Sequence, residues 1–377
     1  MKDTTQMKTF NSNMCRILFA TCLSALCLIA PSTQAATITV TNTNDSGAGS
    51  LRQALADAVN GDTINFNSSL NGQTIMLTNG ELLVTTNVAI NGPGANMLAV
   101  DANHASRLFY IAAGKDVTIS GLTISNGKVI SDYGGGIYND NATLTLSSCT
   151  ISGNSVDFGV GGGIYNDSVN GGATLTVSNC TISGNSAYFG GGIYNYFGTV
   201  TVTNTTLSGN WCENGGGGIR NDGTLTITNS TLSGNFCGNS ADDHGGGIYN
   251  SGTLKIGDTI LKVGPSGENV YNVQQLGSVT SLGYNLSSDN GGGYLTATGD
   301  RITTDPMLGP LQNNGGPIFT HLPASNSPAI DASDPTLGMD QRGSGFVRVM
   351  NGRIDIGAVE AQATPTPTAT PRPHGHH

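Results

Sequence analysis

The sequence is poor in charged and aromatic residues, and positive charge is especially scarce. Charged residues make up 11% of the 377 positions and aromatic residues 6%, with a single tryptophan. The 15 lysines and arginines are outnumbered by 25 acidic residues, which leaves a formal net charge of −10. Nucleic acids and anionic membranes are bound by clustered positive charge. The composition therefore argues against both as partners.

Long hydrophobic runs are almost absent, apart from one near the N-terminus. Basic residues precede an apolar stretch over residues 17–30, and small residues ending at Ala35 form a cleavage signal. This order is typical of a secretory signal peptide, and the run is short for a membrane span. We therefore predict a signal peptide over residues 1–35. The mature chain is expected to be secreted, extracellular or on the cell surface, without inserting into a membrane.

Helical periodicity is found in only one segment. Apolar residues between Leu51 and Val59 recur at helical spacing, Ser50 and Gln53 match a capping box, and Gly61 is a suitable stop. A stacked-repeat protein needs its open end covered. We therefore predict that residues 36–61 form an N-terminal strand and a capping helix.

Glycine is abundant instead, and much of it lies in repeated motifs. The hexapeptide Gly-Gly-Gly-Ile-Tyr-Asn begins at Gly134, returns at Gly161 and recurs with small changes further on. The isoleucines of these motifs are spaced 27, 29, 26 and 29 residues apart; they are Ile137, Ile164, Ile193, Ile219 and Ile248. A period in this range predicts a stack of repeated structural units.

Within a repeat, apolar residues alternate with polar ones. Leu144 and Leu146 alternate with Thr143 and Thr145, a pattern typical of short strands. Three short strands in about 25 residues match one coil of a parallel β-helix, with neighbouring coils about 4.8 Å apart. A sandwich of antiparallel hairpins is the alternative, but it gives no reason for one motif to repeat in register.

The predicted fold class is therefore all-β: a single right-handed parallel β-helix, the hand following the general preference of parallel crossovers. We place the β-helix at residues 62–300, an irregular C-terminal cap at 301–360 and a Thr/Pro-rich tail at 361–377. The side chains expected to point inward are Ile137, Leu144, Leu146 and Ile151. A polar turn position is expected to stack as a structural ladder; it holds Ser148, Asn179, Asn204 and Asn229.

Two groups of residues are candidates for function. The residue after each repeated isoleucine should point outward, so that Tyr138, Tyr165, Tyr194, Arg220 and Tyr249 form a column. Exposed aromatics can stack on sugars or anchor a protein, and they can also stack only for stability.

The second group is a short acidic cluster followed by a histidine. Asp242, Asp243 and His244, with Arg220, are weak catalytic candidates, because cleavage of acidic glycans uses carboxylates and a nearby base. A solvated loop is the simpler interpretation of the same residues. The sequence contains no recognised metal motif, phosphate loop or nucleophile constellation, so no cofactor is predicted.

Cysteines and aspartates allow two further predictions. Four cysteines follow residue 35, and the register pairs Cys149 with Cys180 and Cys212 with Cys237 if disulfides form, never crossed. Buried thiols are the alternative, most of all for the first pair. In the C-terminal cap, four aspartates could gather a Ca²⁺ ion or could simply cap turns; they are Asp305, Asp331, Asp340 and Asp355.

Several motifs carry a family resemblance. The Gly-Gly-Gly-Ile and Ser-Gly-Asn repeats resemble the Gly-Gly-Ala-Ile and Phe-x-x-Asn repeats of chlamydial polymorphic outer-membrane proteins, although Ile or Leu replaces Phe here. Residues 41–54 resemble the opening of bacterial secreted right-handed β-helix proteins. The motifs at 305–317, 327–331, 340–343 and 355–360 resemble the choice-of-anchor domain that ends many such proteins.

This resemblance implies a secreted or surface β-helix without shared catalytic residues. We therefore expect an adhesin-like or structural display scaffold, monomeric, that binds an extracellular glycan or a host or cell-surface protein. The alternative is a polysaccharide-active enzyme, similar to pectate lyases or polygalacturonases, that acts on acidic glycans.

Overall fold

The structure is a computed structural model that describes residues 35–169, 171–238, 244–333, 339–350 and 352–362. The chain divides into two units, residues 1–35 and 36–377, and the second is described below. The predicted signal peptide and most of the Thr/Pro-rich tail lie outside the described residues. Among the described residues, no helix is long and apolar enough to cross a membrane.

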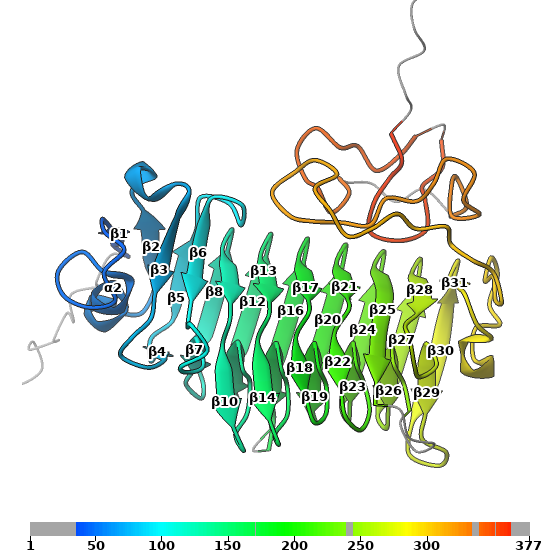
Figure 1. Ribbon diagram of the computed structural model, residues 1–377, viewed down its shortest axis with the longest axis horizontal. Coiled ribbons are helices and arrows are strands. Elements are labelled where there is room, and N and C mark those ends of the chain that lie inside the picture. Colours follow the sequence, from blue (N-terminus) through cyan, green and yellow to red (C-terminus); the bar gives the residue numbers. More distant parts are fainter. Residues whose placement is uncertain (1–34, 170, 239–243, 334–338, 351, 363–377) are drawn as a thin grey trace, which may run out of the picture. The chain divides into compact units, whose positions relative to one another are not determined.

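Four columns of strands wind into one parallel β-helix (Figure 1). Pairings between the named strands are all parallel, in contrast to an antiparallel sandwich. The predicted all-β fold, a single parallel β-helix with a short N-terminal helix and an irregular C-terminal cap, is confirmed. In the middle part of the β-helix, each coil passes through four parallel strand columns in turn. These columns are named sheets A, B, D and C, and their strands are given below.

Sheets A and B carry the longest columns. Sheet A contains β1 (Thr37–Val40), β2 (Asp62–Phe66), β5 (Val88–Asn91), β8 (Asp116–Ser120), β12 (Thr143–Ser147), β16 (Thr174–Ser178), β20 (Thr199–Thr203), β24 (Thr224–Thr228), β27 (Thr253–Gly257) and β30 (Ser278–Gly283). Sheet B contains β3 (Gln73–Met76), β6 (Leu98–Asp101), β9 (Thr123–Ser125), β13 (Thr150–Ser152), β17 (Thr181–Ser183), β21 (Thr206–Ser208), β25 (Thr231–Cys237), β28 (Ile260–Val263) and β31 (Leu286–Ser287).

Sheet D is a fourth, short column that the sequence reading did not separate. It contains β10 (Lys128–Ile130), β14 (Ser155–Asp157), β18 (Ser186–Ala187), β22 (Trp211–Cys212) and the end of β25, which pairs with both β21 and β22. Sheet C contains β4 (Leu82–Val84), β7 (Phe109–Ile111), β11 (Ile137–Asp140), β15 (Ile164–Asp167), β19 (Ile193–Tyr196), β23 (Ile219–Asn221), β26 (Ile248–Asn250) and β29 (Val270–Asn272).

The remaining regular elements are short helices. α2 (Leu51–Asp57) begins after Ser50, whose hydroxyl accepts a hydrogen bond from the backbone N–H of Gln53. Leu51 and Leu55 pack into the hydrophobic core, so α2 covers apolar surface at the first coils. Two 3₁₀ turns complete the set; they are η1 (Ser68–Leu70) and η2 (Gly291–Gly293).

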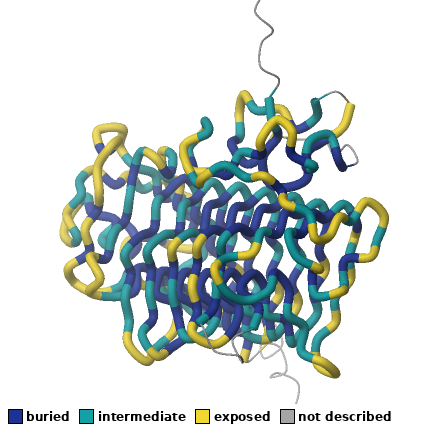
Figure 2. Tube along the Cα trace, turned by 45° about the vertical axis from the view of Figure 1, so that its right-hand side comes forward, coloured by how far each residue is buried: buried dark blue, intermediate teal, exposed yellow. Residues whose placement is uncertain are grey.

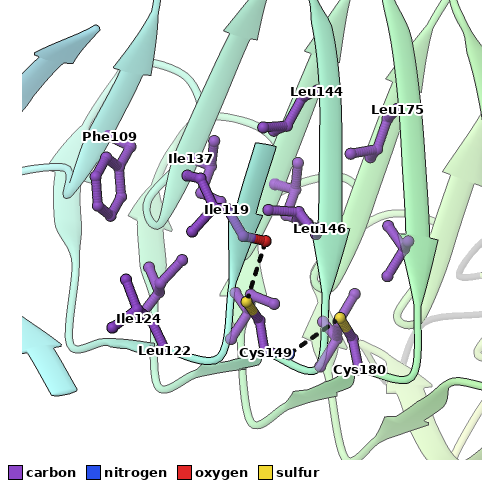
Figure 3. Close-up of a cluster of buried hydrophobic side chains, with 14 of the residues drawn as sticks. Phe109, Ile119, Leu122, Ile124, Ile137, Leu144, Leu146, Cys149, Leu175 and Cys180 are labelled. Atoms are coloured by element: carbon purple, nitrogen blue, oxygen red, sulfur yellow. Dashed lines mark hydrogen bonds between the residues drawn. The ribbon is translucent and has the colours of Figure 1, made fainter. Parts of the chain in front are cut away.

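The core follows the predicted alternation. The four residues expected to point inward are all fully buried in one continuous cluster. Figure 3 shows part of this cluster, where Cys149 and Cys180 lie among aliphatic side chains. Figure 2 shows buried positions alternating with half-buried and exposed ones along the coils.

The repeated glycines have a steric cause. A Cβ at Gly162 would clash with the main-chain oxygens of Ser186 and Gly191 in the following coil. Coils are close enough here for backbone to touch backbone, so only glycine fits.

The predicted ladder of turn asparagines is wrong, and other asparagines form the ladders. Asn179, Asn204 and Asn229 have φ angles of 51°, 47° and 50°, and no described hydrogen bond joins two of their side chains. They serve as left-handed turn residues, which asparagine tolerates better than most residues.

One ladder runs along the strands of sheet C, and the other runs along the bends between sheets B and D. The first joins the Asn of each Ile-Tyr-Asn motif; it contains Asn139, Asn166, Asn195, Asn221, Asn250 and Asn272. The second joins the Asn of each Ser-Gly-Asn motif; it contains Asn154, Asn185, Asn210 and Asn235. Each buried amide bonds to the next coil, which satisfies polar groups in the interior.

Candidate functional site: an aromatic face and an adjoining cleft

The predicted outward column exists on sheet C. Tyr138, Tyr165, Tyr194, Arg220 and Tyr249 are paired in register through successive strands. The same column extends to Tyr110 before it and Tyr271 after it. Sequence reasoning missed these two tyrosines, although Phe109-Tyr-Ile and Val270-Tyr-Asn offered the same apolar–Tyr pattern.

The centre of the column is covered rather than open to solvent. Tyr165 is 4% exposed and Tyr194 is 7% exposed. Other aromatic residues cover them: the ring of Tyr133, from the turn before β11, stacks 4.9 Å from that of Tyr165, and Tyr196, at the end of the same strand, lies 5.8 Å from Tyr194. The sequence pattern gave the direction of the column but not the turns that fold over it.

The phenols of the column are hydrogen-bonded to aspartates of the next coil. The hydroxyl of Tyr110 donates to Asp140 (2.5 Å), that of Tyr138 to Asp167 (2.8 Å) and that of Tyr194 to Asp222 (2.5 Å). In each of these three pairs, one phenol of the column donates to one carboxylate of the next coil.

This pairing fixes the protonation of the phenols. The hydrogen bond to Asp140, with burial, raises the pKa of Tyr110 to about 12. Burial, together with hydrogen bonds to aspartate, raises the pKa of Tyr138 and Tyr194 further, and burial raises that of Tyr165. These phenols are therefore donors at neutral pH and cannot act as bases.

Arg220 takes the place of a tyrosine in the column, and its guanidinium packs against two aromatic rings. Its guanidinium carbon lies 4.2 Å from the ring centroid of Phe189 and 4.5 Å from that of Tyr249. Its Nε also contacts Asp222 at 3.2 Å. A cation between two rings stabilises the stack, so Arg220 has a structural partner on each side.

A set of aromatic side chains remains exposed along this side of the β-helix. We call it the aromatic rim; its members are Tyr133 (45% exposed), Phe158 (80%), Phe197 (62%) and Trp211 (37%). Tyr133 and Phe197 belong to the same network of ring contacts as the tyrosine column, through Tyr165 and Tyr196. Trp211 lies on sheet D, paired with Phe236 of the next coil.

An open cleft of about 720 Å³ adjoins the N-terminal end of the tyrosine column. It is lined by two turns, residues 79–81 and 104–107, and by strand β10 with Asp132 after it. Buried Arg107 organises it, with contacts to Glu81 (2.7 Å) and Asp132 (2.8 Å) and a hydrogen bond to the carbonyl of Tyr133 (2.9 Å).

The cleft is joined to the aromatic face by the same arginine. The guanidinium of Arg107 lies 5.2 Å from the ring centroid of Tyr138 and 5.8 Å from that of Tyr110. His104 and Lys128 also line the cleft, and Lys128 contacts Asp157 at 2.8 Å. The sequence analysis did not find this cleft, because its residues come from two turns and a short strand that carry no repeated motif.

His244, the one described residue of the predicted Asp242–His244 cluster, does not line the cleft. Asp242 and Asp243 lie outside the described residues. His244 stacks on Tyr271 with ring centroids 4.0 Å apart and contacts Glu268 at 3.6 Å. Two tyrosine rings, Tyr249 and Tyr271, separate His244 from Arg220 along the column.

The four cap aspartates are divided among different partners. Asp305 is exposed and contacts Lys262 at 3.3 Å, while Asp340 is buried against Arg342. Asp331 and Asp355 do converge, and they meet Glu360 instead of the other two aspartates. The sequence could not show which acidic residues the irregular chain gathers.

The cysteines divide into one bonded pair and two thiols. Cys212 and Cys237 form a disulfide with Cα atoms 4.6 Å apart, at register-matched positions of sheet D. Cys149 and Cys180 are buried free thiols, and the backbone N–H of Cys149 donates to the Cys180 sulfur at 3.3 Å. Burial raises the pKa of the Cys180 thiol.

No protein-family model and no curated protein matches the sequence. The fold is similar to that of several solved structures. A structure of pectate lyase Pel9A is 14% identical, covers 88% of this chain and 97% of its own, and gives a TM-score of 0.48. An alginate lyase from Paenibacillus sp. str. FPU-7 is 14% identical, with 66% and 95% covered and a TM-score of 0.36.

A third structure, the PL6 family alginate lyase AlyGC, is 14% identical, with 87% of this chain and 60% of its own covered and a TM-score of 0.22. These likenesses concern the fold, and at such identities they carry no argument about activity. The strand pairing shows a parallel β-solenoid, and pectate and alginate lyases are among the structures similar to it.

Proposed function

We propose that the protein is a non-catalytic β-helix that binds a glycan chain along the aromatic face of sheets C and D. The observation that carries this proposal is the aromatic rim, exposed beside a cleft with polar walls. Sugar rings present apolar faces that stack on aromatic side chains, while their hydroxyls need polar partners. The face and the cleft together supply both.

The spacing of the rim favours a polymer over a single sugar. Tyr133, Phe158 and Trp211 lie on turns or strands of different coils, the first and last three coils apart. Three coil spacings correspond to roughly 14 Å. Such a surface suits several consecutive sugar units.

Binding without cleavage fits the state of the nearby carboxylates. Asp140, Asp167 and Asp222 each accept a hydrogen bond from a phenol of the column. In the cleft, Glu81 and Asp132 are held by the two ends of one guanidinium. Each of these carboxylates already accepts a protein donor, although the side chains of Glu81 and Asp132 remain 38% and 48% exposed.

A second candidate function is cleavage of an acidic polysaccharide in the cleft. One observation favours it: His104 and Lys128 line the same cleft as Glu81 and Asp132. A cation can neutralise a uronate carboxylate, and a histidine or lysine can remove a proton. This reading needs Glu81 or Asp132 to be released from Arg107 when substrate binds.

A glycan panel separates these functions. The purified chain is incubated with neutral and uronate-rich polysaccharides, and both binding and new reducing or unsaturated ends are measured. We expect binding without turnover, weakened at least about tenfold when Tyr133→Ala and Phe197→Ala each remove one stacking ring. Phe319→Ala is the matched control, because Phe319 is equally exposed but lies in the C-terminal cap.

Turnover that is lost in Lys128→Ala would establish the second function. Absence of binding to every glycan would contradict both. We further propose that the protein acts at the cell surface or outside the cell, as an adhesin-like or display scaffold, and that it is a monomer.

A further inference from the structure

We propose that Asp331, Asp355 and Glu360 form a Ca²⁺ site that staples the C-terminal cap. One carboxylate oxygen from each residue lies within 4.8 Å of the others. Asp355 and Glu360 are fully buried and Asp331 is half-buried, so the cluster has one side near solvent. This proposal is independent of glycan binding.

The buried carboxylates of this cluster lack a balancing charge contact. Neither Asp355 nor Glu360 has a lysine, arginine or histidine nitrogen within ion-pair distance among the described residues. Arg348 is close: its Nη2 donates to the main-chain carbonyls of Asp355 (3.3 Å) and Gly357 (2.5 Å) and to Oδ1 of Asn229 (3.0 Å), while its Nε and Nη1 have no hydrogen-bond partner among the described residues. Buried charges are normally paired, or they coordinate a metal.

A second observation points to a ligand. The Oε1 atom of Glu360 is buried and has no hydrogen-bond partner among the described residues. Its Oε2 atom accepts the N–H of Asp355 at 2.8 Å, which holds the carboxylate in place beside Asp355. An oriented, buried and unpartnered carboxylate oxygen is what a cation site presents before it is filled.

The backbone also orients the other carboxylate. Oδ1 of Asp355 accepts the N–H of Asp331 at 2.8 Å, and Oδ2 accepts the N–H of Ala361 at 2.7 Å. Each of these oxygens keeps further lone pairs for a cation. Ca²⁺ suits the set because it takes carboxylate, carbonyl and water oxygens in flexible geometry, whereas Mg²⁺ demands a near-ideal octahedron.

The location gives the site a structural purpose. It joins two cap segments, around Asp331 and around residues 355–361, and both contact the β-helix nearby. The hydroxyl of Ser333 and the N–H of Gly357 both bond to Asp258, and the N–H of Ala358 bonds to Thr231 at 3.1 Å. A bound Ca²⁺ would therefore hold the cap on sheets A and B.

Calorimetric titration of the chelator-treated chain with CaCl₂ and with MgCl₂ tests the proposal. We expect one Ca²⁺ per chain, with a Kd of about 10⁻⁴–10⁻³ M as in extracellular modules, and Mg²⁺ at least about tenfold weaker. Glu360→Gln should abolish binding, and Asp305→Asn should leave it unchanged because Asp305 is exposed and contacts Lys262. No binding to the wild-type chain, or binding retained in Glu360→Gln, would overturn the site.

A second measurement uses the wild-type chain, so it does not depend on the folding of a variant. Amide hydrogen exchange of the wild-type chain is compared with and without Ca²⁺. Exchange at residues 353–361 should slow at least about threefold with Ca²⁺, while that of sheet C should not change. If Glu360→Gln fails to fold, Asp331→Asn takes its place in the titration, since Asp331 is half-buried. Equal exchange in both conditions would refute the staple.

Discussion

The outward side chains of sheets B and C have different surroundings on the same β-helix. On sheet B, Thr150, Thr181, Thr206 and Thr231 are paired in register. Thr150 is half-buried, whereas the other three are fully buried beneath the C-terminal cap. On sheet C, the outward column is aromatic and is covered in part by aromatic residues of its own strands and turns.

The difference shows how each face obtains its partners. The sheet B threonines are satisfied from far away in the sequence: Gln341 accepts from Thr206 (2.5 Å), and its amide donates to the carbonyl of Cys180 (2.7 Å). The sheet C phenols are satisfied by aspartates one coil away. The polar face is covered by a segment that is remote in the sequence, whereas the aromatic face, whose partners are local, keeps exposed rings beside it.

The largest expected effect comes from detaching the cap. Arg342→Ala leaves the buried carboxylate of Asp340 without its guanidinium, which should destabilise the cap by about 3–5 kcal/mol. Amide hydrogen exchange should rise across residues 339–350 and at Thr206, while sheet C stays protected. Lys262→Ala, which removes an exposed ion pair, should change little. Equal loosening of sheet C would show that the two faces are not separable.

A slightly smaller effect is expected inside the coils that support both faces. Asn185 donates to the Asn210 oxygen (2.9 Å) and to the carbonyl of Ile151 (3.0 Å), and it is fully buried. Asn185→Ala should lower the free energy of unfolding by about 2–4 kcal/mol, because buried groups lose their partners. Chemical denaturation measures it.

The matched control is Asn179→Ala. Asn179 sits in a turn with φ of 51°, where the left-handed strain on alanine costs about 1 kcal/mol. If the control is as damaging as Asn185→Ala, the buried asparagines are not the ladders that hold the coils.

The repeat made the coils predictable, and the reasons for success and failure are specific. Ile137 and its counterparts, and the alternation at Leu144, mark inward positions because a strand has a period of two. The pairing of Cys212 with Cys237 followed from the same register. The asparagine ladders were missed although the same alternation places Asn139, two residues after Ile137, on the inward side; the analysis assigned only apolar residues to inward positions.

The site was less predictable than the coils. Covering of Tyr165 depends on Tyr133, which lies in a turn outside the repeated motif. The gathering of Glu360 with Asp331 depends on how an aperiodic cap folds back. Sequence periodicity fixes a stack, and it says little about turns and caps that depart from the period.

A moderate effect is expected within the sheet C column. Tyr194→Phe removes the hydrogen bond to Asp222 and should lower the free energy of unfolding by about 1–2 kcal/mol. Tyr165→Phe is the control, since the Tyr165 hydroxyl makes no hydrogen bond with another described residue. Denaturant unfolding of both variants compares them, and a larger loss in Tyr165→Phe would mean that packing and not the phenol–carboxylate pairing holds the column.

The smallest effect is a pH dependence of the covered face. His321 is buried, and its Nδ1 lies 2.7 Å from the carbonyl of Gly309, which can only accept. Nδ1 therefore carries the proton, and Nε2 accepts from the Ser208 hydroxyl at 2.9 Å. Burial, with a minor contribution from Lys262, lowers the pKa of His321 below 6.5.

Because the unfolded histidine gains a proton before the folded one does, stability of the cap should be constant above pH 6.5 and fall as pH drops toward the folded pKa. Thermal unfolding between pH 8 and pH 5 measures this loss. His321→Gln keeps a donor and an acceptor but cannot titrate, so its unfolding should lack this component. An identical pH profile in the variant would assign the dependence to other groups.

The most direct test of the account is to locate a bound glycan. Amide hydrogen exchange is measured with and without the tightest-binding polysaccharide of the panel, at saturating concentration. If the glycan binds the aromatic rim, exchange should slow at residues 131–135 and 196–198. It should not change at residues 204–208, at sheet B, or at residues 319–321 of the cap. Protection confined to sheet B or to the cap would contradict it.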